Sequence, residues 1–288
     1  MWCEEKVTKP TADPDMEVYR FVSFFELYSL IKEGQLRLTS LHKMDDKNEG
    51  VGKILRSLEL SPIVHRDRQE QKITQHMTYI TCWTTTPDNI AMWTLYSLNQ
   101  ENIRIKTTVS KLYSAIKKIN YAIHSSMNYS PSYQDVFCLE YKNLRQCKED
   151  IEIKLQRLKD KPQPSHYAGK AEKIRTLYKS RRRYLQEDSI LDNDTWKYKD
   201  ENYTFENEVR GQIEFSATDE DSHDYCHSSL CDFSEFSDFI YAPIFENFID
   251  EICFDPRCPK YKTKIFTEII NPNKNIHVVE SHAFGTIL

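Results

Sequence analysis

The chain has few glycines, and this shortage excludes several classes of enzyme. Only six glycines occur among 288 residues, which leaves little material for a glycine-rich loop around a phosphate group. The patterns G-x-G-x-x-G, G-x-x-x-x-G-K-[ST], G-x-S-x-G and H-E-x-x-H are all absent. Rossmann-type dinucleotide folds, P-loop enzymes, serine hydrolases and zincins therefore lose support. An anionic ligand would have to be held by arginine side chains or helix ends.

Long apolar runs are also missing. No stretch reaches the roughly 18 apolar residues that a membrane-spanning helix requires, and the first residues, Met1 to Glu5, lack the basic-then-apolar pattern of a secretory signal. The formal net charge of -5 does not suggest a protein that coats nucleic acid or a membrane surface. We therefore expect a cytoplasmic protein with no membrane partner, in which the eight cysteines are free thiols.

Short strand patterns alternate with short helical patterns along the chain, which predicts an α+β fold. The clearest unit is a strand at 18–22, a helix at 24–33 that Ser23 begins and Gly34 ends, and a strand at 36–40. Further strands are predicted at 79–84, 103–107, 136–141, 205–215, 239–241, 251–254 and 276–280, and further helices after Asn89 and at 110–124 and 262–270. No repeat divides the sequence, so we predict one domain over residues 1–288.

The middle of the chain changes charge abruptly. Residues 142–183 contain fourteen Lys or Arg against five Asp or Glu, whereas residues 186–260 contain twenty acidic residues against five basic ones. The basic part has helical spacing and is densest at Arg181-Arg182-Arg183. We interpret it as a helical insertion at about 142–190, either a solvated hairpin that balances the acidic part or an arm for an acidic partner such as nucleic acid.

One segment concentrates charge in the way that reactive sites do. In an extended run from Phe205 to Phe215, the side chains of Glu206, Glu208 and Arg210 would share one face. Two carboxylates at that spacing raise each other's pKa, while the guanidinium lowers it. The same arrangement is found in catalytic sites and in plain ion-pair ladders on exposed strands, so the segment alone does not decide between them.

Two metal sites are conceivable from the residue types. The cluster His223, Cys226, His227 and Cys231 carries nitrogen and sulfur ligands, although its spacing is not that of a usual zinc knuckle. Asp45, Asp46 and Glu49 could join Glu206 and Glu208 as oxygen ligands of magnesium, the arrangement of a metal-dependent phosphodiesterase or nuclease. The alternative for the first cluster is an acidic loop with incidental His and Cys, and for the second a capped helix start. We assign no metal ligand.

Four separated segments together resemble the mostly bacterial and phage-linked domain-of-unknown-function family 2971. They are Tyr19-Arg20-Phe21, the turn from Met44 to Glu49, Cys82 with the run from Met92 to Tyr96, and the run from Phe205 to Arg210. Their order and spacing agree over about residues 17–281. The turn departs from the family pattern, which usually has Phe-Asn where this chain has Met44-Asp45. This family looks like a distant branch of the ADP-ribosyltransferase superfamily, which implies a split mixed β-sheet flanked by helices.

The resemblance implies a function and a set of site residues. It implies that the protein uses NAD to modify a macromolecule, protein or nucleic acid, or to destroy the cofactor, as toxins and antiviral effectors of this kind do. Glu208, or else Glu206, would be catalytic, because a carboxylate favours the positive charge that develops on the ribose. The residues that would hold the cofactor are Arg20, Tyr96, Trp93, Thr84 and Arg210. A phosphodiesterase and a non-catalytic nucleic-acid-binding module remain the alternatives.

Overall fold

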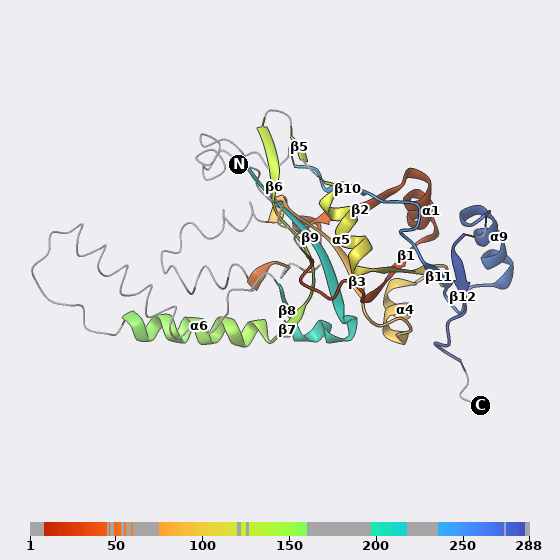
Figure 1. Cartoon of the computed structure of the whole chain (residues 1–288). Coiled ribbons are helices and arrows are strands. Elements are labelled where there is room, and N and C mark those ends of the chain that lie inside the picture. The colour runs from red at the N-terminus through yellow and green to blue at the C-terminus, as the bar shows by residue number, and fades with distance from the viewer. Residues whose placement is uncertain are drawn as a thin grey trace, which may run out of the picture.

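A computed structural model describes residues 9–44, 46, 49–52, 55, 59, 75–119, 122–124, 127–159, 197–217, 236–273 and 275–285. In this part of the chain, ten strands form one mixed sheet (Figure 1), whose main path runs β12-β11-β4-β1-β3-β9-β6-β5. The strands are β1 (Glu17–Val22), β2 (Gln35–Ser40), β3 (Thr78–Thr84), β4 (Ile103–Thr108), β5 (Ala122–His124), β6 (Met127–Cys138), β9 (Glu208–Ala217), β10 (Phe239–Pro243), β11 (Glu251–Phe254) and β12 (His277–Val279).

Helices flank this sheet. They are α1 (Phe24–Glu33), α4 (Ile90–Tyr96), α5 (Val109–Lys117) and α9 (Lys260–Ile270). Neighbouring strands are antiparallel except for β11 and β12, which run parallel. The helix α5 buries Leu112 and Ile116 against the sheet and lies so close to β9 that a β-carbon at position 211 would crowd the side chain of Ile116. The prediction of an α+β fold with a mixed sheet flanked by helices is confirmed.

The sheet forks at β3. One edge of β3 pairs with β9 along its whole length, from Thr78 to Thr84. The other edge pairs with β2 at Tyr79 and Ile80 and then with β1 at Thr84. Two strands thus share one edge of β3, and among the described residues the stretch 81–83 between them has no register partner on that edge. This fork opens a space in the plane of the sheet.

Local sequence signals set the ends of the elements around the fork. The hydroxyl of Ser23 accepts a hydrogen bond from the N–H of Glu26, which begins α1, and Gly34 ends it with a left-handed backbone at φ 64°. The side chain of Asn89 caps α4 in the same way by accepting from the N–H of Ala91. The helices predicted after Ser23 and after Asn89 are therefore confirmed, together with the strands on either side of them.

Two predicted elements are wrong in their extent. The helix expected at 110–124 ends at Lys117, and Ala122–His124 pairs instead as a strand with β6. The strand expected at 136–141 divides into the long β6, which ends at Cys138, and β7 (Glu140–Lys142), which leaves the main sheet. Cross-strand pairing decides both cases: β5 pairs with the adjacent β6, and β7 pairs with a strand much later in the chain, which a local pattern cannot report.

The region of the predicted insertion begins at a second, two-stranded sheet. Here β7 pairs in parallel with β8 (Tyr198–Asp200), and α6 (Leu144–Lys159) extends from β7 away from the main sheet (Figure 1). The run Arg181-Arg182-Arg183 and the cluster His223, Cys226, His227 and Cys231 lie outside the described residues. The single domain and the insertion boundaries stay predictions. Within the described part, every helix is too short or too polar to span a membrane.

Candidate active site at the fork of the sheet

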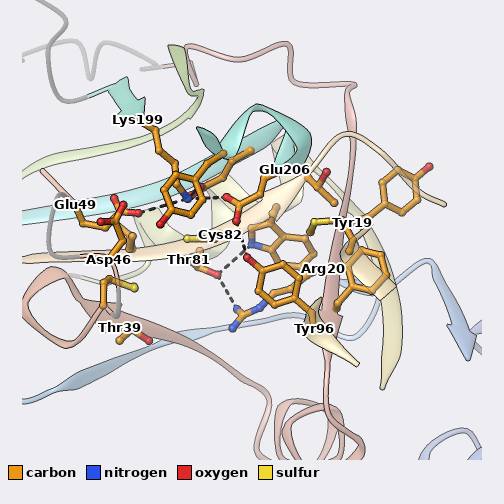
Figure 2. A pocket seen from close by; sticks show the side chains of 18 residues that line it. Tyr19, Arg20, Thr39, Asp46, Glu49, Thr81, Cys82, Tyr96, Lys199 and Glu206 are labelled. Atoms are coloured by element: carbon orange, nitrogen blue, oxygen red, sulfur yellow. Dashed lines mark hydrogen bonds and ion pairs between the residues drawn. The ribbon is translucent and has the colours of Figure 1, made fainter. Parts of the chain in front are cut away.

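A pocket of about 400 Å³ lies at the fork. Its size is within the range of small-molecule sites, roughly 300–1,000 Å³. Side chains from both branches of the fork and from α4 meet in it (Figure 2). The lining residues include Arg20 of β1, Thr81, Cys82 and Thr84 of β3, Met92 and Tyr96 of α4, Asp46 and Glu49 of the acidic turn, and Lys199, Tyr203, Glu206 and Glu208.

A cluster of buried charges forms one wall of the pocket. Arg210 bridges two carboxylates: its Nη1 donates to Glu49 at 2.8 Å and its Nε to Glu208 at 2.9 Å. The Nζ of Lys199 donates to Glu206 at 2.6 Å and to Glu208 at 2.7 Å. The Lys199 amine also lies 3.5 Å from Glu49. All five side chains are buried.

The cluster carries one surplus negative charge, because three carboxylates face two cations. Burial by itself would raise the pKa of Glu208, but Arg210 and Lys199 outweigh it and hold that pKa at about 2. Burial also opposes the charged form of Lys199, yet Glu208 and Glu49 raise its pKa above the ordinary value. Glu208 is therefore ionised at neutral pH, and the wall attracts positive charge.

The guanidinium of Arg20 lies on another wall of the same pocket (Figure 2). Its Nη1 donates to the hydroxyl of Thr81 at 2.8 Å, and its Nη2 donates to Glu26 at 2.8 Å. Arg37 lies 3.5 Å from the same carboxylate, so that two guanidiniums share Glu26. This side of the fork consequently carries one surplus positive charge and can bind an anion.

Tyr96 and Trp93, both predicted to hold the cofactor, have different surroundings. Tyr96 lines the pocket, is 45% exposed, and donates its hydroxyl to Glu206 at 2.6 Å. The Trp93 side chain is fully buried, and its ring meets Phe21 edge-on with centroids 4.6 Å apart. Its indole N–H donates to Asp88. In this structure Trp93 is part of the core, and it does not reach the pocket as predicted, because its position on α4 faces the sheet.

The predicted strand from Phe205 to Phe215 is wrong at its start. Residues Glu201–Glu206 form a short 3₁₀ helix, η3, which the side chain of Asp200 caps, and β9 begins only at Glu208. Between them Asn207 has a left-handed backbone at φ 42°. Glu206 and Glu208 therefore do not share a strand face, yet the turn brings both carboxylates to Lys199. The cluster is buried, which excludes an exposed ion-pair ladder.

The remaining predicted residues divide between the pocket and the layer behind it. Thr84 lines the pocket at the end of β3 and its hydroxyl accepts from the N–H of Thr86. Arg210 is not among the lining residues and holds Glu49 and Glu208 from behind. Sequence reasoning missed Lys199 and also Tyr141, whose hydroxyl accepts a hydrogen bond from the N–H of Glu208 at 2.7 Å. Both follow unremarkable strand patterns, and no local motif marks them.

No group of described residues has the arrangement of a metal site. The glutamates that would join Asp46 as magnesium ligands already form ion pairs with Lys199 and Arg210. Asp45 lies outside the described residues. A cation would have to displace both basic side chains from buried contacts, at a cost in free energy.

Comparisons with known proteins give a distant likeness. No family model and no curated protein matches the chain, so membership of the domain-of-unknown-function family stays a prediction. Three solved structures of Thermus sp. 2.9 DarT are similar in fold. They are complexes with NAD+ (8% identity, 94% of this chain and 97% of that chain covered, TM-score 0.34), with carba-NAD+ (9%, 94%, 97%, 0.31) and with ADP-ribosylated ssDNA (8%, 95%, 97%, 0.33).

Proposed function

We propose that the chain is an NAD-using enzyme similar to the ADP-ribosyltransferases, with its active site in the pocket at the fork. The bond between nicotinamide and the ribose carbon would break, and nicotinamide would leave with the bonding electrons. An oxygen or nitrogen atom of a macromolecule, or water, would form the new bond and give up a proton to a carboxylate. The product is then an ADP-ribosylated acceptor or free ADP-ribose.

The observation that carries this proposal is the opposite charge of two walls in one pocket. Arg20 offers a planar pair of donors that suits a pyrophosphate. The wall of Glu206 and Glu208 has a surplus negative charge, which favours the positive charge that develops on the ribose as nicotinamide leaves. Residues 20 and 208 are far apart in sequence and line the same pocket because β1 and β9 both adjoin β3.

The two glutamates differ in their contacts, and we assign them different roles. Both oxygens of Glu208 are bound by cations, one by Arg210 and one by Lys199, so Glu208 remains ionised and acts through its charge. Glu206 accepts from Tyr96 and Lys199. We propose that Glu206 takes up the proton that the acceptor group releases, because Tyr96, its hydrogen-bond partner, is partly exposed to solvent. Thr84 supports this wall from the end of β3.

The test is release of nicotinamide from NAD by purified protein, with and without cell extract. We expect Glu208→Gln and Arg20→Ala to lower turnover by on the order of 100-fold, since each loses a contact to charge. Arg145→Ala is the control, because this exposed arginine pairs with Glu149 on α6 and does not line the pocket. Equal release by the wild type and both site variants, all folded, would refute the proposal.

A role as a toxin or antiviral effector is part of the proposal and has its own test. Expression of the wild type in bacterial cells should slow growth, and expression of Glu208→Gln should not. EDTA should leave nicotinamide release unchanged, whereas a metal-dependent phosphodiesterase would lose its activity. Two results together would favour the phosphodiesterase instead: growth arrest that persists in Glu208→Gln, and a phosphodiesterase activity of the purified protein that EDTA abolishes.

A further inference from the structure

The two-stranded sheet at the base of α6 contacts Glu208 of the candidate active site. In this sheet Tyr141 of β7 and Lys199 of β8 are register partners. The hydroxyl of Tyr141 accepts from the backbone N–H of Glu208 at 2.7 Å, and the amine of Lys199 donates to its carboxylate at 2.7 Å. Leu139, just before β7, donates its N–H to the carbonyl of Glu208 at 3.0 Å. The same small element therefore holds Glu208 by its backbone and by its side chain.

The sheet itself packs against α6. Inside the sheet the amine of Lys142 donates to the hydroxyl of Tyr198 at 2.6 Å, and Asn143, which precedes α6, donates to Glu201 of η3 at 2.8 Å. Tyr198 is buried in a small apolar cluster with residues of α6, among them Leu144 and Ile151. Tyr198 precedes Lys199 in β8, so the packing of α6 sets the position of the lysine that binds both glutamates.

We propose that Tyr141 and Lys199 are positioning residues for Glu208, and that the base of the α6 region is therefore a working part of the active site. This inference rests on the proposed function. Lys199 has the larger role, because it is a buried cation within reach of three carboxylates. Tyr141 orients the backbone of Glu208 and does not contact its carboxylate through any hydrogen bond among the described residues.

The groups that surround Glu208 and affect its ionisation come from several elements. They are Arg210 on β9, Lys199 on β8, Tyr141 on β7, Cys82 on β3, Glu206 at the end of η3, and Glu49. Removal of Lys199 would leave Arg210 alone against three carboxylates. Glu208 should then take up a proton at a higher pH than in the wild type, and the acid limb of the pH–rate profile should move with it.

The first measurement is kinetic. In Lys199→Met, kcat for nicotinamide release should fall about 10- to 100-fold, as for other residues that orient a reacting group, and its acid limb should move to higher pH. Lys199→Arg should recover a large part of the rate. In Tyr141→Phe, kcat should fall about fivefold without movement of the acid limb, because a buried N–H loses its acceptor. Lys148→Met is the matched control on α6, because Lys148 is exposed, pairs with Glu152 and does not line the pocket.

The second measurement does not require activity. Carboxyl carbon NMR of glutamate-labelled protein, assigned with Glu206→Gln and Glu208→Gln, gives the titration of Glu208 directly. A rise in the pKa of Glu208 by about one unit or more in Lys199→Met, with no change in Lys148→Met, supports the proposal. Identical titration in Lys199→Met and wild type, or an identical acid limb where release is measurable, overturns it. A wild type without nicotinamide release refutes the proposed function, while the titration still decides the role of Lys199.

Discussion

Substitution of Arg210 by methionine should destabilise the protein strongly, because it leaves buried carboxylates without their cation. The Arg210 side chain is 2% exposed and binds Glu49 at 2.8 Å and Glu208 at 2.9 Å. Loss of one partner from a buried ion pair typically costs about 3–5 kcal/mol. Burial raises the pKa of Glu208, but Arg210 and Lys199 together lower it to about 2, so part of this lowering should disappear with Arg210.

The pH dependence has a definite sign. The pKa of Glu208 is depressed in the folded state, so its stabilising contribution is complete above about pH 4.5 and is lost as the pH falls through about 2. In Arg210→Met the pKa of Glu208 should rise toward its ordinary value. The variant should therefore be less stable than the wild type near neutral pH, and the difference between the two should shrink as the pH is lowered.

Urea denaturation at several pH values measures both effects. A double-mutant cycle with Glu49→Gln isolates the contact between Arg210 and Glu49, and we expect a coupling of about 1–3 kcal/mol. The Glu49 substitution should cost less in the Arg210→Met background, because it removes a carboxylate that no longer has its partner. A free energy of unfolding for Arg210→Met within about 0.5 kcal/mol of the wild type, or a strictly additive cycle, would refute the reasoning.

Two further predictions concern packing and the open side of the pocket. In Gly211→Ala the new β-carbon would lie 2.5 Å from the Cδ1 of Ile116 and 3.0 Å from the Cγ2 of Thr81, and we expect a loss of about 1–3 kcal/mol by thermal unfolding. Ile116→Val should recover part of that loss, and an unchanged melting temperature in Gly211→Ala would contradict this account. Tyr96→Phe removes the hydroxyl that donates to Glu206 at 2.6 Å, and it should lower nicotinamide release about fivefold. The melting temperature should stay close to that of the wild type, whereas unchanged release would show that this contact has no role.

Short-range signals in the sequence determined much of the architecture around the site. Ser23 begins α1 and Gly34 ends it, Asn89 begins α4, and the β-branched and aromatic run at 78–84 forms β3. Capping and side-chain periodicity act within a few residues, so a sequence can display them without any knowledge of partners. The charge pattern of this segment also predicted that Glu206 and Glu208 would lie near a basic side chain.

Tertiary structure alone decided how these residues meet. The left-handed backbone of Asn207 takes Glu206 off the strand, and the long-range pairing of β7 with β8 brings Lys199 to both glutamates. The fork places Arg20 beside a wall built from residues nearly two hundred positions later. Such contacts depend on strand order and register, which arise from the packing of the whole sheet, and no local pattern of residue types contains them.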